Sequence, residues 1–197
     1  GETFLIIGGH IDLSNSALAA MSGVMVALLI KSGMPWPLAM LLVLLVGAVV
    51  GLINSTLANV FSIQPFIATL AVASICEGVG YIISDGRPIG VTNRSFINLG
   101  TYKLFGWIPV PVIILIVSFL VFGFILKKTT FGRKVYIIGG NAEAAHLAGI
   151  SPKRISTVLY VLSSAIGALV GIILAARMHT GAPTAASGAD FDAITAA

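Results

Sequence analysis

Long uncharged stretches alternate with short polar ones along this chain. A helix needs about 20 apolar residues to cross the hydrocarbon core of a bilayer. One stretch is long enough for two crossings, and the segment "NVFSIQP" divides it, because Pro65 suits the first turn of a new helix. The pattern predicts five membrane-spanning helices, at Leu13–Ile30, Pro37–Val60, Pro65–Ser84, Ile108–Leu126 and Ile155–Ala176.

The first apolar segment, Thr3–Gly8, is too short to span a membrane alone. We expect it to be either the end of a helix or one half of a broken helix. The chain starts at Gly1 inside this apolar segment and stops inside "FDAITAA". We therefore expect an internal piece of a longer membrane protein, with residues 1–197 in a single transmembrane domain that lacks an N-terminal helix and the C-terminal helices.

Composition supports the membrane class. The chain is 57% hydrophobic and 9% charged, with a mean hydropathy of +1.05, whereas soluble domains carry about 25% charged residues. The predicted fold is an all-α polytopic membrane protein with about five transmembrane helices and a partial one. The single Cys76 excludes a disulfide framework and a cysteine-based zinc site.

Basic residues indicate the orientation. Six of the eleven Lys and Arg residues fall in the loop 127–154: Lys127, Lys128, Arg133, Lys134, Lys153 and Arg154. The positive-inside rule places this loop in the cytoplasm, so Asp85–Trp107 and the turn at Lys31 lie outside. Because the basic residues lie between apolar spans, they are explained by topology, and we expect no nucleic-acid partner.

Small residues recur at helical spacing in two spans. Gly47 and Gly51 form one GxxxG pattern, and Ser163, Gly167 and Gly171 form a similar face. Such faces let helices approach closely in lipid. We favour tight packing within one subunit over a dimer interface.

Three stretches carry candidate chemistry. "GGHIDLSNS" places His10 and Asp12 after two glycines, and Asp12, Ser14 or Asn15 can cap the next helix. Broken backbone at membrane depth is tolerated only inside protein or along a cavity, although an ordinary interfacial cap is the alternative. Glu77 lies within a predicted span, where an ionisable residue suggests function, although it could also pair with Arg87 near the outer interface.

The third stretch is "GGNAEAAHLAGI", from Gly139 to Ile150. Asn141 can cap a short helix, Glu143 suits its first turn and Gly149 suits its end. No P-loop, catalytic triad, paired carboxylates or metal-binding spacing stands out, so we expect no enzyme activity, no cofactor and no metal site.

The chain resembles the permease subunits of ABC sugar importers of the ribose, xylose and autoinducer-2 branch. "GGNAEAAHLAGI" is similar to their cytoplasmic signature. Further matches follow in the family's order through the whole chain: "GGHIDLS", "QPFIATLA", "IPVPVIILI", "TTFGRKVYIIGGN" and "GAPTAASGADFDAITAA". The resemblance implies the middle of a permease of about ten helices, in the cell inner membrane.

The resemblance also implies partners and site residues. Two permease subunits, identical or paralogous, would form the pore in the lipid, a periplasmic binding protein would deliver the solute, and separate ABC subunits would bind ATP. The helix Asn141–Ala148 would couple to those subunits through Asn141, Glu143, Ala144, Ala145 and Gly149. We expect the translocation path to be lined by His10, Asp12, Ser14, Phe66, Thr69 and Glu77.

Some positions depart from the family pattern. Glu77 stands where relatives usually carry arginine, and Ser16 where they usually carry glycine. The expected function is import of a small polar solute, namely a monosaccharide. A branched-chain amino-acid ABC permease, an ion-coupled secondary transporter with intramembrane carboxylates, and a structural membrane scaffold are the alternatives.

Overall fold

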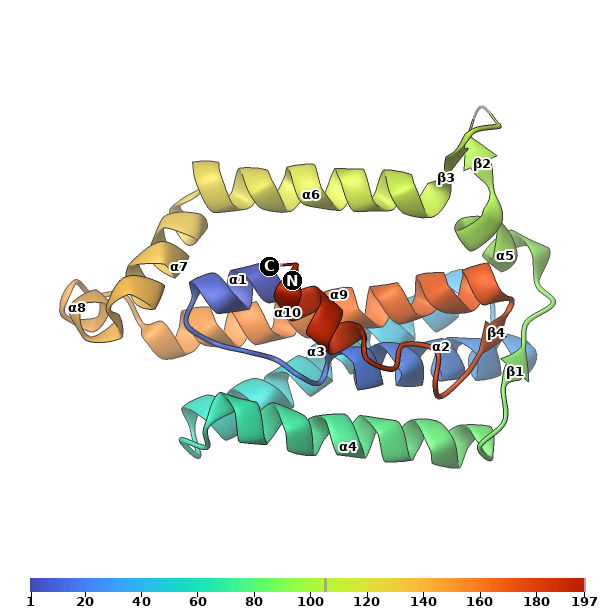
Figure 1. Cartoon of the computed structure of the whole chain (residues 1–197), viewed down its shortest axis with the longest axis horizontal. Helices are drawn as coiled ribbons and strands as arrows, with labels where there is room; N and C mark the ends of the chain where they lie inside the picture. The colour runs from blue at the N-terminus through green and yellow to red at the C-terminus, as the bar shows by residue number, and fades with distance from the viewer. Residues whose placement is uncertain (105, 197) are drawn as a thin grey trace.

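The computed structural model describes residues 1–104 and 106–196, and nearly all of its regular structure is helical (Figure 1). The helices are α1 (Glu2–Ile7), α2 (Asn15–Lys31), α3 (Trp36–Asn59), α4 (Pro65–Ser84), α5 (Arg94–Thr101), α6 (Val110–Lys128), α7 (Thr130–Gly140), α8 (Ala142–Leu147), α9 (Pro152–Met178) and α10 (Ala189–Thr195). Short strands β1 (Ile89–Gly90) and β4 (Thr180–Gly181) pair antiparallel, as do β2 (Lys103–Leu104) and β3 (Ile108–Pro109).

The five predicted spans correspond to α2, α3, α4, α6 and α9, which confirms an all-α polytopic membrane protein. Four of them are long and apolar enough to cross a membrane, whereas α2 has only 17 residues. A helix of that length rises about 26 Å, slightly less than the hydrocarbon core. The α2 helix is short because a non-helical segment, residues 8–14, precedes it.

Close backbone contacts hold α9 against α3 and α2. A Cβ atom added at Gly51 would lie 2.6 Å from the carbonyl oxygen of Tyr160, and one at Gly171 would overlap the carbonyl oxygen of Ala19. Lipid tails offer no hydrophobic drive between helices, so this close packing supplies the contact energy. The prediction that the small-residue faces pack within one subunit is confirmed.

Replacing Gly51 with alanine is expected to lower the free energy of unfolding by about 1–3 kcal/mol, because the added methyl group pushes α3 and α9 apart. The matched control is Gly78→Ala in α4, where an added Cβ atom meets nothing within 4 Å. That change is expected to be neutral or to stabilise by up to about 1 kcal/mol. Unfolding in mixed detergent and denaturant, followed by circular dichroism, measures both; equal stability of the two variants would contradict this packing.

The loops gather at the two ends of the bundle (Figure 1). One end carries α7, α8 and the turn between α3 and α4, in which Ser62 has φ +54°. The other end carries α5 and both strand pairs. This arrangement agrees with the predicted alternation of loops, although α5, α7 and α10 were not predicted.

The chain after α9 turns back beside α2. Gly181 approaches the carbonyl oxygen of Gly23 so closely that a side chain would not fit. Further along, Ala186 packs on Ala19 and Ala20, and α10 then crosses the middle of the bundle (Figure 1). Residues 182–188 are therefore a non-helical segment running alongside a membrane helix.

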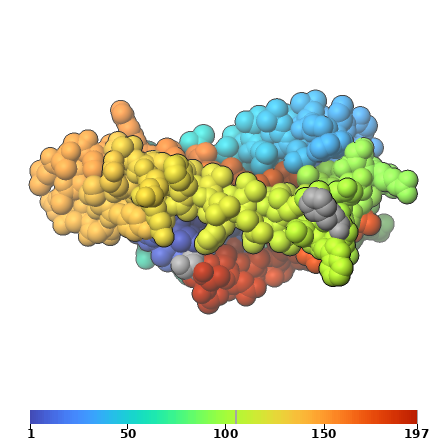
Figure 2. All heavy atoms as spheres, turned by 90° about the horizontal axis from the view of Figure 1, so that it is seen from above, coloured from blue at the N-terminus to red at the C-terminus, as the bar shows by residue number. Residues whose placement is uncertain are grey.

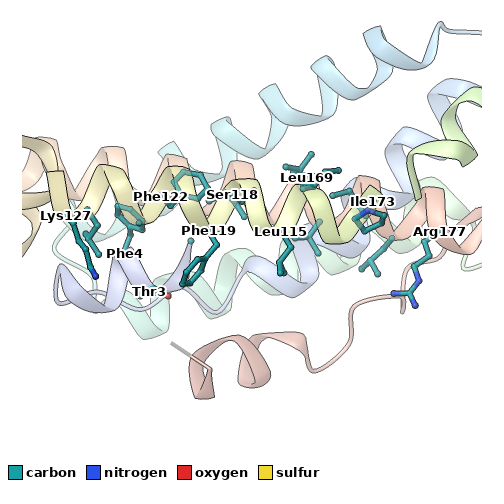
Figure 3. Close-up of a pocket in the computed structure, with 18 residues that line it drawn as sticks. Thr3, Phe4, Leu115, Ser118, Phe119, Phe122, Lys127, Leu169, Ile173 and Arg177 are labelled. Atoms are coloured by element: carbon teal, nitrogen blue, oxygen red, sulfur yellow. The ribbon is translucent and has the colours of Figure 1, made fainter. Parts of the chain in front are cut away.

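The helix α6 stands apart from this bundle. None of its residues is buried, and Figure 2 shows it crossing the face of the molecule between α3 and the C-terminal segment. An apolar groove of about 550 Å³ separates α6 from α9 and α1. Figure 3 shows Phe119 and Phe122 along this groove, with Lys127 towards one end and Arg177 at the other.

Candidate functional site

The chain reverses direction between α1 and α2. Figure 1 shows α1 leading from the middle of the bundle towards the end that carries α7, and the following segment returning to the middle, where α2 begins. The reversal uses Gly9 at φ +80°, and the amide of His10 donates to the carbonyl of Leu5 at 2.8 Å. The non-helical backbone predicted from the two glycines is present, and α1 and α2 are not halves of one straight helix.

Asp12 organises the start of α2. Its side chain is 1% exposed, and its Oδ1 accepts hydrogen bonds from the amide of Ser14 at 2.9 Å and from the Ser14 hydroxyl at 2.6 Å. Because the α2 helix begins at Asn15, Asp12 binds donors that the helix itself leaves unpaired. This arrangement replaces the side-chain cap by Ser14 or Asn15 that the sequence also allowed.

Polar side chains from four other parts of the chain join Asp12. Asn54 of α3 donates to the Ser14 hydroxyl at 2.8 Å. Glu2 of α1 accepts from the amide of Asp12 at 3.0 Å and from the Asn15 side chain at 3.1 Å. The Asn15 amide group also reaches Ser163 of α9 at 3.0 Å. We call Glu2, Asp12, Ser14, Asn15, Asn54 and Ser163 the polar cluster.

The polar cluster lies among apolar helices, where unpaired polar groups are costly. Within the described residues it is well connected, although Oδ2 of Asp12 and Oδ1 of Asn54 accept no hydrogen bond there. The cluster thus fixes the backbone reversal and retains some capacity for further donors. Its two carboxylates come together only through the fold, which explains why no carboxylate pair stood out in the sequence.

The six residues predicted for the translocation path do not form one site. Asp12 and Ser14 belong to the polar cluster, and Thr69 is fully buried beside it, where its hydroxyl accepts from the amide of Leu13 at 3.2 Å. The ring of His10 lies 5.5 Å from the ring of Tyr160, at a tilt of 55°. Phe66 is half exposed on α4.

Glu77 lies elsewhere, on an exposed position of α4. It lines a second cavity, of about 240 Å³, together with Ser16 of α2 and Ser187 of the C-terminal segment. Arg87, its possible partner, follows the end of α4 at Ser84. The structure therefore places Glu77 in a cavity wall within the span.

Several residues of the site escaped the sequence analysis. Glu2 sits in a segment too short to interpret, and Asp190 reaches Ser16 from the far end of the chain, accepting from its amide and its hydroxyl. Asn54 could have been identified from the sequence, because an amide side chain inside an apolar span usually forms a hydrogen bond to another helix.

The helix α8 has the start and stop expected of it. Oδ1 of Asn141 accepts from the amides of Glu143 at 3.0 Å and Ala144 at 2.9 Å. At the other end Gly149 has φ +78°, and the amide of Ile150 donates to the carbonyl of Ala145 at 3.0 Å. These contacts confirm a short helix closed at both ends.

The side chains of α8 divide between two faces. Asn141, Glu143, Ala144 and Gly149 are exposed, whereas Ala145 is fully buried within the chain. Leu147, which the sequence analysis did not single out, is 86% exposed.

The α7 helix lies between α8 and the segment in which the chain reverses direction after α1. Val135 packs with Phe4 and Leu5 of α1. Gly139 touches the carbonyl of Ile7 so closely that a Cβ atom would overlap it. The loop that carries α8 is thus in direct contact with the backbone that enters the polar cluster.

Comparisons with known proteins identify relatives of the chain. The chain is 42% identical to the ribose import permease protein RbsC of Bacillus subtilis (strain 168), over 100% of this chain and 61% of the relative. It is 38% identical to the L-arabinose transport system permease protein AraH of Escherichia coli (strain K12), over 100% of this chain and 60% of the relative. No solved structure matches.

A third relative, the D-allose transport system permease protein AlsC of Escherichia coli (strain K12), is 35% identical over 100% of this chain and 60% of its own length. The chain therefore spans about three fifths of the length of these relatives. The family described as "Branched-chain amino acid transport system / permease component" matches residues 1–197. By this match along its whole length, the chain belongs to that family of transport permeases.

Proposed function

We propose that this chain is part of the membrane-spanning subunit of an ATP-driven ABC importer for a small polar solute, namely a monosaccharide. The observation that carries the proposal is α8, a capped helix that exposes Glu143, Ala144 and Leu147 at the basic end of the bundle. The names of the relatives, which refer to ribose, arabinose and allose, favour a sugar over a branched-chain amino acid.

In this proposal Asn141, Glu143, Ala144, Ala145 and Gly149 couple the chain to a separate ATP-binding subunit. The exposed members touch that subunit, and buried Ala145 holds α8 in place. ATP is bound by the partner, so the permease itself needs no cofactor. The basic residues of the loop 127–154 support a cytoplasmic position for α8. The cell inner membrane is the location that we propose for the chain.

The solute path is formed by two permease subunits, and a periplasmic binding protein delivers the solute to it. Within this chain, His10, Asp12, Ser14, Phe66, Thr69 and Glu77 are assigned to the path or to its support. The close contact of Asp12, Ser14 and Thr69 supports a positioning role for them. Exposed Glu77 is in a position to meet solute.

An ion-coupled transporter is the second candidate. The contact of Glu2 with Asp12, and of Asp190 with Ser16, gives it the intramembrane carboxylates that it requires. The two candidates differ in energy source. Uptake that continues without ATP and stops when an ionophore collapses the ion gradient would select the ion-coupled mechanism.

Purification of the full-length protein from its native membrane tests the proposed function. We expect an ABC ATP-binding subunit to co-purify, and a periplasmic binding protein to stimulate ATP hydrolysis by the reconstituted complex. The ligand bound to that protein would identify the solute. A permease that imports solute without any ATP-binding subunit would contradict the proposal.

Leu147→Ala is expected to weaken binding of the ATP-binding subunit by about tenfold or more if Leu147 is one of the few central anchor residues of the interface, whose truncation costs about 2 kcal/mol. Val60→Ala is the matched control, because Val60 is also an exposed apolar residue at this end of the bundle. Titration of the labelled ATP-binding subunit onto permease in nanodiscs measures both affinities. Equal affinities for both variants would remove Leu147 from the interface.

A further inference from the structure

The segment 182–188 exposes non-helical backbone within the membrane region. Its position is fixed against α2 by Gly181 beside Gly23, Ala186 on Ala19, and Asp190 on Ser16. Its other side is open, because Thr184, Ser187 and Gly188 are exposed. Non-helical backbone at membrane depth is stable only when it is buried in protein or lines a water-filled cavity. The open side of this segment therefore does not face lipid.

The position of Glu77 is a second, independent observation on the same region. It is exposed within α4, a helix long and apolar enough to span the membrane. Ionisable side chains inside spans face a bundle interior or a water-filled cavity. The 240 Å³ cavity has Glu77 on one wall and Ser16, Ser187 and Gly188 on the others. A charged side chain and an exposed loop thus line one and the same cavity, which neither can share with lipid.

The walls of this cavity define a ligand class. The Glu77 carboxylate accepts hydrogen bonds, and the Ser187 hydroxyl can donate and accept. The Ser16 hydroxyl donates to Asp190 and is left as an acceptor. Asp190 adds a second carboxylate beside Ser16. None of the described residues that line the cavity is a Lys, Arg or His, so the cavity repels anions. Its volume is below the roughly 300–1,000 Å³ of pockets for drug-sized ligands, which suits a solute the size of one sugar ring.

We propose that this cavity holds a neutral polyhydroxy solute, with Glu77 accepting hydrogen bonds from its hydroxyl groups. The inference rests on the proposed import function and assigns to it a solute subsite and a selectivity. Glu77 is the specificity-determining residue, because its charge favours neutral sugars over sugar acids. Asp190 is a positioning residue, since its contacts with Ser16 hold the C-terminal wall against α2.

Cysteine labelling in the full-length protein with its partners tests the cavity. Cys76, the single cysteine of this chain, is buried and is first replaced by alanine, as is any cysteine in the rest of the full-length protein. Ser187→Cys and Ala17→Cys then place a thiol on two walls of the cavity. Ser74→Cys is the control, because Ser74 is exposed on α4 but does not line the cavity. The probe is a charged, membrane-impermeant thiosulfonate, with D-ribose, L-arabinose and D-allose as protecting solutes.

We expect rapid labelling at positions 187 and 17, slow labelling at position 74, and protection of the first two by at least one neutral sugar. Labelling that is equally slow at all three positions would show a dry cavity and overturn the proposal. Labelling at 187 and 17 that no neutral sugar slows, or that only a cationic amino sugar slows, would overturn the assigned ligand. Failure of the parent protein to import any sugar with ATP would instead count against the proposed function.

Glu77→Gln supplies the second measurement. Protection of the thiol at position 187 by D-ribose and by its carboxylate counterpart, D-ribonate, is compared with and without the Glu77→Gln change, and the ratio of the two protecting concentrations measures the preference. Removal of the charge is expected to reduce the preference for ribose by about tenfold or more, because like charges brought together repel strongly. An unchanged preference, with normal labelling of the cavity, would show that Glu77 does not determine selectivity.

Discussion

A Gly139→Leu variant of the full-length transporter is expected to lose most ATP-driven uptake while it still binds the ATP-binding subunit. Any side chain at this position overlaps the backbone of Ile7, so α7 and α1 must separate. The change leaves the exposed face of α8 intact. Uptake should fall by roughly 5–150-fold, the range spanned by coupling free energies of about 1–3 kcal/mol. Solute uptake and ATP hydrolysis are measured together in proteoliposomes.

Gly140→Leu is the control for this experiment. Gly140 is the next residue of α7, but a Cβ atom there meets nothing within 4 Å. The control should therefore import solute at close to the normal rate. If both leucine variants keep normal uptake and normal coupling to ATP hydrolysis, the contact between α7 and α1 does not transmit the movement.

Asp12→Ala is expected to lower the free energy of unfolding by about 2–5 kcal/mol. The change removes the acceptor for the amide and hydroxyl of Ser14 and leaves these donors buried among apolar helices. Each buried donor without a partner costs about 1–3 kcal/mol. Equilibrium unfolding in mixed micelles measures the effect.

Asp192→Ala is the matched control, because Asp192 is an exposed carboxylate on α10. Its removal is expected to change stability by less than about 0.5 kcal/mol, as is usual for surface positions. A loss of stability at Asp12 no larger than that at Asp192 would show that the polar cluster does not hold the reversal. A full-length Asp12→Asn variant, which keeps one acceptor oxygen, should fall between the two.

Local signals in the sequence were enough to predict the spans and α8. Pro65 begins α4 as expected, and Asn141 and Gly149 close α8 through contacts within a few residues. The small-residue faces were also interpreted correctly, since Gly51 and Gly171 meet other helices of the same chain. In each case the residues that determine the structure are close in sequence or repeat with the helical period.

The reversal and the C-terminal segment depend on contacts between distant residues. Asn54 meets Ser14 across 40 positions, and Asp190 meets Ser16 across 174. No periodic pattern encodes such pairs. Ala145 shows the same limit on a smaller scale, because its burial results from the way α8 folds back on its own chain. The sequence suggested candidate residues, but it could not say which of them lie together in the fold.

The separation of α6 from the bundle bears on how the protein is made. Because none of its residues is buried, α6 gains little from packing against the described part of the chain, and its apolar residues favour lipid by themselves. In the proposed topology, Lys127 and Lys128 hold the end of α6 at the cytoplasmic surface. During synthesis α6 can therefore enter the bilayer before α9 has been translated. In that topology its insertion leaves α7 and α8 on the cytoplasmic side before the rest of the bundle has assembled.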